Sequence, residues 1–179
     1  PNLQKPALET PEHVVPKPSP DFNRTDENPS PQIDEADRVL GARLSRAMGE
    51  GTGLKAGIIP TQSATLLSAD LAGLLHGKSA AIACVGPKDG DIRALICLPG
   101  PLADAIIAKA CGARGSTGRI GDGWTLSAID CALLEQLLVP FGPALGADMV
   151  LQSIETDVPY VSGLLPAHEV SVSEFSVEA

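Results

Sequence analysis

The last third of the chain alternates helical and extended patterns in an order that few folds can accommodate. An amphipathic helix is predicted from 127 to about 146, followed by a strand over 149–155 and a closing strand over 170–177. Pro140 and Pro143 interrupt the helical pattern, so we expect the helix to kink just before them or to split in two. The predicted apolar stripe of this helix comprises Ile129, Ala132, Leu133, Leu137 and Leu138.

The first 33 residues differ in composition from the remainder. They hold eight of the sixteen prolines and all three asparagines, and their apolar residues are sparse and unperiodic. Such a segment buries too little surface to offset the entropy of ordering it. We therefore predict a disordered, proline-rich linker over 1–33 and a folded domain over 34–179.

Composition excludes several classes of function. The net charge is −9 and the isoelectric point about 4.7, which disfavours nucleic acid and anionic membrane surfaces as partners. No run of 18 apolar residues occurs, so no membrane insertion is expected. Aromatic residues are only 3 %, so Ala, Leu, Ile and Val must fill the core. The chain opens at Pro1 without an initiator Met, which indicates a piece of a longer protein.

The reactive residue types form no recognisable site. The four cysteines (84, 97, 111 and 131) lie among apolar residues without a Cys-x-x-Cys pair, so we expect them reduced and buried. The three histidines are far apart, which predicts no metal site. The segment 73–79 suggests a phosphate-binding loop, but its first glycine is replaced by Ala72 and a helix precedes it. A helix end at Gly77 is the better interpretation, and no cofactor is expected.

The first part of the domain has its own helix–strand pattern. A helix capped by Asp34, with Asp37 in a partial capping box, should end at the glycines 49, 51 and 53. A strand over 54–67, broken at Pro60, precedes a short helix capped by Ser68 or Asp70. The clearest hairpin pairs 80–85 with 92–98 around Asp89-Gly90. Its second strand is apolar almost throughout, which predicts cover on both faces.

The element order indicates an internal repeat. Helix, strand, short helix, hairpin and helix (102–110) are followed by helix, strand and strand, or about one and a half copies of one unit. The second copy lacks its last strand and helix. We therefore expect the chain to stop inside its domain.

A glycine-rich loop separates the two copies. It places five glycines in the twelve residues 112–123, between two helices rather than behind a strand. That position does not favour phosphate binding. Two interpretations stay open, a protein contact loop into which a partner backbone can approach closely and a plain connector.

Three stretches together resemble one protein family. They are Cys111-Gly112-Ala113-Arg114-Gly115, the helix start from Trp124 to Asp130, and the strand end Glu155 to Pro159 with the later Pro166-Ala167-His168-Glu169. The set resembles the middle domain of FliM, the flagellar motor switch family. The resemblance implies a compact CheC-like α/β domain of two pseudo-symmetric halves, here with an incomplete second half.

The resemblance also implies a function without catalysis. The chain would be a structural and switching component of the cytoplasmic ring at the flagellar basal body, on the cytoplasmic face of the inner membrane, linking chemotaxis signals to rotation direction. Its loop residues Gly112, Ala113, Arg114 and Gly115 would contact FliG. Neighbouring FliM copies would pack beside it, and FliN and phosphorylated CheY would bind through parts outside this chain.

One residue departs from the family pattern, and two alternatives remain. Ala113 stands where the family has a second glycine, and a positive φ there would cost about 1 kcal/mol. The enzymatic alternative is a CheC-like phosphatase of phosphorylated CheY, which uses a Glu and an Asn three residues later on one helix face. No Asn occurs in 34–179, which disfavours it. The other alternative is an unrelated α/β domain.

Overall fold

A computed structural model describes residues 33–77, 80–113, 125–165 and 169–178. The predicted linker, apart from Ile33, lies outside this part of the chain. The described residues form six helices and five strands in the order α1 (Glu35–Thr52), β1 (Gly57–Leu67), α2 (Ser68–Leu75), β2 (Ala81–Pro87), β3 (Ala94–Leu98), α3 (Gly100–Ala110), α4 (Ala128–Leu137), α5 (Phe141–Leu145), β4 (Met149–Glu155), α6 (Val158–Ser162) and β5 (Glu169–Glu178).

The first helix begins and ends where its capping residues predict. Asp34 accepts a hydrogen bond from the backbone N–H of Asp37 at 2.8 Å. At the other end Gly53 adopts φ 70° and donates its N–H to the carbonyl of Gly49. Gly49 and Gly51, also predicted as terminators, lie inside the helix.

The carboxylate of Asp37 does not complete a capping box. It accepts hydrogen bonds from the hydroxyls of Ser63 on β1, at 2.5 Å, and Ser173 on β5, at 2.7 Å. These bonds hold the pKa of Asp37 below its ordinary value, with the Ser63 bond contributing most and burial opposing. A buried carboxylate thus joins α1 to two strands that are distant in sequence.

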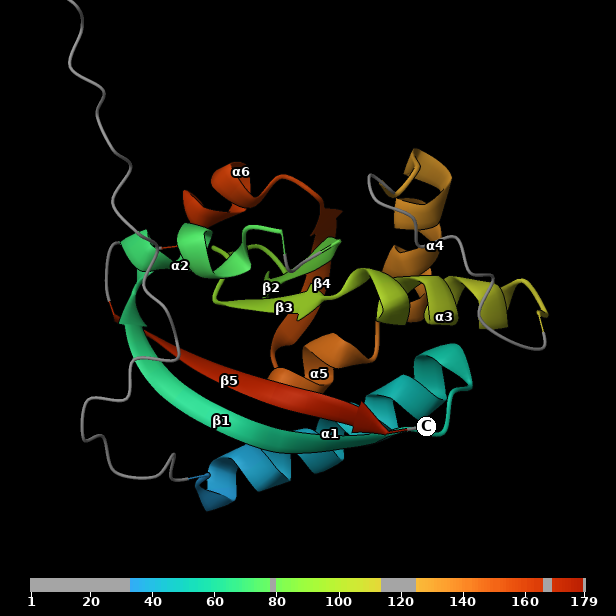
Figure 1. The fold of residues 1–179 in the computed structure, drawn as a ribbon, viewed down its shortest axis with the longest axis horizontal. Coiled ribbons are helices and arrows are strands. Elements are labelled where there is room, and N and C mark those ends of the chain that lie inside the picture. The colour runs from blue at the N-terminus through green and yellow to red at the C-terminus, as the bar shows by residue number, and fades with distance from the viewer. Residues whose placement is uncertain (1–32, 78–79, 114–124, 166–168, 179) are drawn as a thin grey trace, which may run out of the picture.

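The strands form two separate antiparallel sheets. β1 and β5 make a long curved ribbon, in register from Gly57 opposite Glu178 to Leu67 opposite Glu169 (Figure 1). The register shifts between Pro60 and Gln62, so the predicted break at Pro60 is a bulge within a continuous strand.

The second sheet has the order β3-β2-β4. Its central strand β2 is buried from Ala81 to Gly86, whereas β3 is half-buried except at Leu98. Both faces of β3 are nevertheless covered, as predicted, because Ile96 packs against one hydrophobic cluster and Leu95 and Cys97 against another. β2 is more deeply buried because β4, which is remote in sequence, pairs with its other edge.

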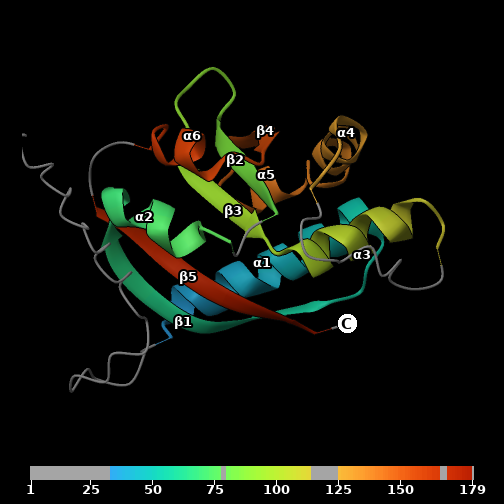
Figure 2. The same cartoon turned by 45° about the horizontal axis from the view of Figure 1, so that its top comes forward.

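Alternate residues of β2 enter two different hydrophobic cores. Ala81 and Ala83 face a main core built from α1, α3, α4, α5 and strands of both sheets. Ile82 and Cys84 face a smaller core under the short helices α2 and α6. Figure 2 shows α2 and α6 on one side of the three-stranded sheet. The three-stranded sheet therefore has helices on both faces, which explains the scarcity of polar residues in β2.

The strand pairing interleaves the two halves of the chain. β1 of the first half pairs with β5 of the second, and β2 of the first half pairs with β4 of the second. This exchange confirms the predicted α/β fold of two similar halves. The short helix α6 had not been predicted, although Asp157, which caps it by accepting from the N–H of Tyr160, and Pro159 in its first turn are ordinary helix-start signals.

The long helix predicted from 127 is divided at its prolines, as expected. α4 ends at Leu137 and α5 begins at Phe141, with Pro140 between them. The prediction of a side-chain cap for α2 was wrong, because Leu67 occupies the cap position and makes no side-chain bond.

Candidate functional site

The predicted contact loop starts from a fully capped helix end. At the end of α3, Gly112 adopts φ 78° and donates its N–H to the carbonyl of Lys109 at 3.0 Å. Ala113 donates its N–H to the carbonyl of Ala108 at 2.9 Å. These two bonds constitute a Schellman motif, which satisfies carbonyls that the helix end leaves unpaired.

The geometry of this helix end shows whether Ala113 must adopt a positive φ. Among the described residues every positive φ belongs to a glycine, so Ala113 carries no such strain. The residue that needs its glycine is Gly112, where an added Cβ would meet nothing within 4 Å and the cost would be conformational alone. Arg114 and Gly115, the other two predicted contact residues, lie outside the described part of the chain.

The helix after the loop begins with a complete capping box. Ser127 accepts from the N–H of Asp130, and the Asp130 carboxylate accepts from the N–H of Ser127. α3 and α4, the two helices that flank the loop, pack against each other (Figure 1).

An exposed apolar stripe lies on α4 and the turn after it. Ile129 is 80 % exposed and Val139 is 55 % exposed. With Ala132 and Gln136 they follow helical spacing on the solvent side, and we call these four residues the α4 stripe. The prediction that Ile129 and Ala132 face the core was wrong, since α4 packs through Leu134 instead.

Two of the four cysteines, Cys84 and Cys131, have thiols whose pKa is raised. Burial raises the pKa of Cys131 on α4, and the carboxylates of Asp130 and Glu135 raise it further. Burial also raises the pKa of Cys84 in β2. No disulfide joins the four cysteines. Cys111 at the end of α3 is exposed, which contradicts the prediction that all four are buried.

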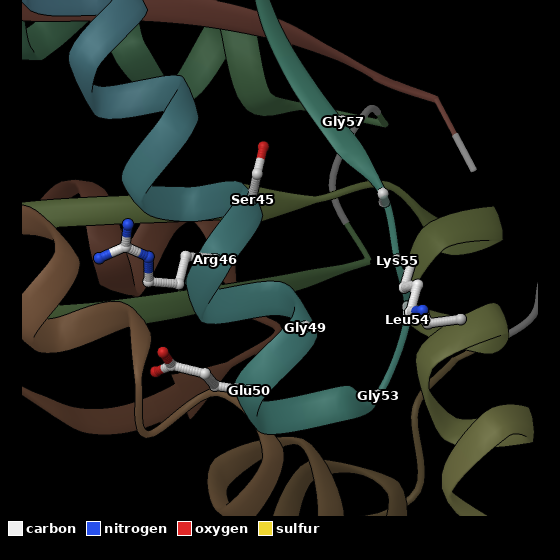
Figure 3. Close-up of a pocket in the computed structure, with 9 residues that line it drawn as sticks. Ser45, Arg46, Gly49, Glu50, Gly53, Leu54, Lys55 and Gly57 are labelled. Atoms are coloured by element: carbon white, nitrogen blue, oxygen red, sulfur yellow. The ribbon is translucent and has the colours of Figure 1, made fainter.

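A shallow groove of about 710 Å³ runs between α1 and the segment leading into β1. Ser45, Gly49 and Gly53 line one side, and Leu54 and Lys55 the other. In Figure 3 the side chains of Arg46 and Glu50 point away from Leu54 and Lys55. The groove therefore presents mostly backbone and small residues rather than convergent catalytic groups.

Two further searches among the described residues concern metals and membranes. No group of three or more His, Cys, Asp or Glu side chains is placed to hold a metal ion there. None of the helices in this part of the chain has the length and apolar character needed to cross a bilayer. The predicted helix end at Gly77 is confirmed by its φ of 71° directly after α2, whereas Lys78 and Ser79 are outside the description.

Fold and site together define a two-half α/β domain with an anchored interhelical loop, and comparison with solved structures finds the same fold among flagellar switch proteins. FliM in the FliG–FliM complex from H. pylori is a match, with a TM-score of 0.62, 13 % identity, and coverage of 78 % of this chain and 80 % of that one. The FliM–SpeE complex from H. pylori matches with a TM-score of 0.57 and 12 % identity, over 82 % of this chain and 76 % of that one. FliY from Thermotoga maritima matches with a TM-score of 0.51 and 14 % identity, over 78 % of this chain and 77 % of that one.

The likeness is one of fold. The described domain is FliM-like in architecture, which confirms the fold expected from the sequence. No protein-family model matches the chain, and no curated protein matches it in sequence. At this level of identity a shared fold indicates which surfaces to test. An argument for function has to rest on the particular residues of this chain.

Proposed function

We propose that this chain is a non-enzymatic component of the flagellar rotor switch and binds FliG through the loop that follows α3. The observation that carries the proposal is the FliM-like fold combined with a glycine loop held at both ends by complete helix caps. Capped anchors fix where a loop begins and ends while leaving its middle available to a partner.

The surroundings of the loop support a protein partner. The α4 stripe exposes two large apolar side chains, Ile129 next to the start of α4 and Val139 in the turn after its end. Exposed apolar side chains of this kind are typical of docking surfaces. A partner that covers the loop and this stripe would bury both.

The wider role follows from the same proposal. Neighbouring copies of the domain pack side by side in the cytoplasmic ring at the basal body, and FliN and phosphorylated CheY bind through parts outside this chain. A signal received there changes the balance between two packings of the ring, and this shift sets the direction of rotation. No residue of the chain makes or breaks a bond.

The test is a quantitative binding assay against FliG from the same organism. The variant Gly112→Asp/Arg114→Glu adds negative charge at the loop and should lower the affinity for FliG by at least about ten-fold, the effect of about 1.4 kcal/mol. The matched control is Gly73→Asp/Arg93→Glu, which makes the same chemical changes on α2 and beside β3, away from the loop. An added Cβ at Gly73 meets nothing within 4 Å.

Two results would contradict the proposal. The first is equal affinity of the unmodified chain and the loop variant for FliG. The second is an equal loss of affinity in the loop and control variants, since that would trace the effect to net charge rather than to the loop. Circular dichroism and urea unfolding of both variants establish that they are folded.

The phosphatase alternative has one observation in its favour, the fold shared with FliY. The chemistry expected of it requires an Asn on a helix face, and 33–179 contain none. We therefore propose no turnover. Phosphate release from phosphorylated CheY above the rate without protein would establish the alternative.

A further inference from the structure

One face of α1 carries arginine side chains without a carboxylate partner. Val39, Ala42, Arg43 and Arg46 follow the spacing i, i+3, i+4, i+7, so they share one side of the helix, and all four are exposed. We call these four residues the α1 arginine face. Val39 is a large apolar side chain within it and is 42 % exposed. Among the described residues neither Arg43 nor Arg46 forms an ion pair.

The rest of α1 holds this face in a fixed position. Near its start, the Asp37 carboxylate is bonded to both strands of the ribbon. The inner side of the helix packs on the main core through Leu44, Ala47 and Met48. Figure 3 shows the Arg46 side chain on the side of α1 away from the segment that leads into β1. A partner would therefore meet a preorganised helix surface, and binding would not have to order it.

The α1 arginine face stands out against the charge of the whole chain. The net charge is −9. Residues 120–179 contain nine Asp and Glu and no Lys or Arg. Three of the seven arginines of the chain lie on α1, at 38, 43 and 46. An acidic partner is thus repelled by most of this chain and attracted at α1, so the charge favours one docking position.

We propose that the α1 arginine face docks an acidic amphipathic helix of a partner protein. Arg43 and Arg46 leave α1 one turn apart, with about 5–6 Å between their Cβ atoms, and carboxylates at i and i+3 or i+4 of a second helix have the same spacing. Guanidinium groups bind carboxylates through two parallel hydrogen bonds. Ala42 lets the two helices approach closely, and Val39 supplies an apolar contact. The proposal does not depend on FliG binding, because these residues belong neither to the loop nor to the α4 stripe.

The carboxylates of a second copy of this chain fit the α1 arginine face less well. On β5 the exposed Glu174 and Glu178 are four residues apart along one strand, about 13 Å, which is more than twice the spacing of the two arginines. On α4, Asp130 and Glu135 are five residues apart and therefore point to different sides of the helix. Asp130 is also engaged in the capping box.

The dimensions of the basic surface disfavour an extended polyanion. Arg38 and Arg46 are eight residues apart, so the positive charge extends about 12 Å along the helix axis. Glu35, which pairs with Arg38, and Glu50 flank it, and both are exposed. A membrane surface or a nucleic acid would bring phosphates against these carboxylates as well. A short acidic helix avoids this repulsion.

A peptide titration followed by NMR tests the proposal. The probe is an alanine-rich helical peptide of about 16 residues with glutamate at every fourth position. At low salt it should shift the amide signals of α1 saturably, and a counterpart with glutamine at the same positions should bind about ten-fold more weakly.

A pair of variants locates the binding. Arg43→Ala/Arg46→Ala should weaken binding of the glutamate peptide by about ten-fold, and alanine is well tolerated in a helix. The matched control is Lys88→Ala/Arg93→Ala, which removes the same charge at two exposed positions outside α1 and should bind like the unmodified chain.

Four outcomes would overturn the proposal. Equal binding of the two peptides is one, and an equal effect of the two variants on peptide binding is another. The third is self-association in sedimentation experiments that is lost in Arg43→Ala/Arg46→Ala, since it would assign the face to a second copy. The fourth is binding to vesicles of phosphatidylserine and phosphatidylcholine that is lost in the same variant, since it would assign the face to a membrane.

Discussion

A close approach between the ends of α1 and α4 gives a sharp test of the fold. Gly51 lies in the last turn of α1, and a Cβ added there would stand 1.9 Å from the carbonyl oxygen of Leu137 at the end of α4. An ordinary contact between carbon and a carbonyl oxygen is about 3.3–3.6 Å. Gly51→Ala therefore forces the two backbones apart by about 1.4 Å.

The size of the effect follows from two opposing terms. Overpacking of this kind costs about 1–3 kcal/mol, while alanine in place of glycine in a helix returns about 0.5–1 kcal/mol. Gly73 in α2 is the matched control, because the same substitution meets nothing within 4 Å and keeps only the helix gain. The helix gain is common to both variants, so their free energies of unfolding should differ by the overpacking cost of about 1–3 kcal/mol, with Gly51→Ala the less stable.

Urea unfolding followed by circular dichroism measures this difference. With a slope of about 2 kcal/mol per molar urea, the midpoints of Gly51→Ala and Gly73→Ala should be separated by about 1 M. If Gly51→Ala is as stable as Gly73→Ala, the end of α1 and the end of α4 are not in contact in solution.

Three further predictions concern single groups. The hydrogen bonds from two serine hydroxyls lower the folded pKa of Asp37 below its ordinary value of 3.8. The stability that this carboxylate contributes is therefore present above pH 3.8 and is lost as the pH falls through the lower folded pKa. Urea midpoints measured from about pH 5 to pH 2 should show this loss in the parent and not in Asp37→Asn. Cys111 should react with a thiol reagent before Cys84, which is buried with a raised pKa; mass mapping of partial labelling shows the order, and prior labelling of Cys84 would contradict the burial of β2. Ser127→Ala should lower the free energy of unfolding by about 1 kcal/mol, and no change would mean that the capping box is not formed.

Local chemistry predicted the element boundaries well. The caps at Asp34, Gly53 and Ser127 and the division before Pro140 were all readable, because each depends on residues within a few positions of one another. The order of the elements indicated an internal repeat, and the family resemblance implied the α/β fold class. The α6 signals were equally local and were overlooked.

Burial on α4 could not be read from periodicity. The helix has apolar residues on two sides, with Ile129 and Ala132 on one and Leu134 and Leu138 on the other. From the sequence of the helix alone, either of these sides could face the core. The packing of α4 against β4 and α3 selects Leu134, which leaves Ile129 in solvent and creates the α4 stripe.

The candidate loop was found from its glycines, but its anchoring was not. The sequence raised the question of a positive φ at Ala113. The structure places the positive φ at Gly112 instead, where the end of α3 forms its cap.

By itself the sequence determined the helices, strands and caps, since these depend on neighbours along the chain. Only the tertiary structure decided which strand is central, which face of α4 is covered, and that Asp37 meets Ser63 and Ser173. The physical reason is that β4 pairs with β2, and β5 with β1, across more than sixty residues of sequence. The hydrogen bonds that bury β2 therefore come from partners that no local pattern identifies.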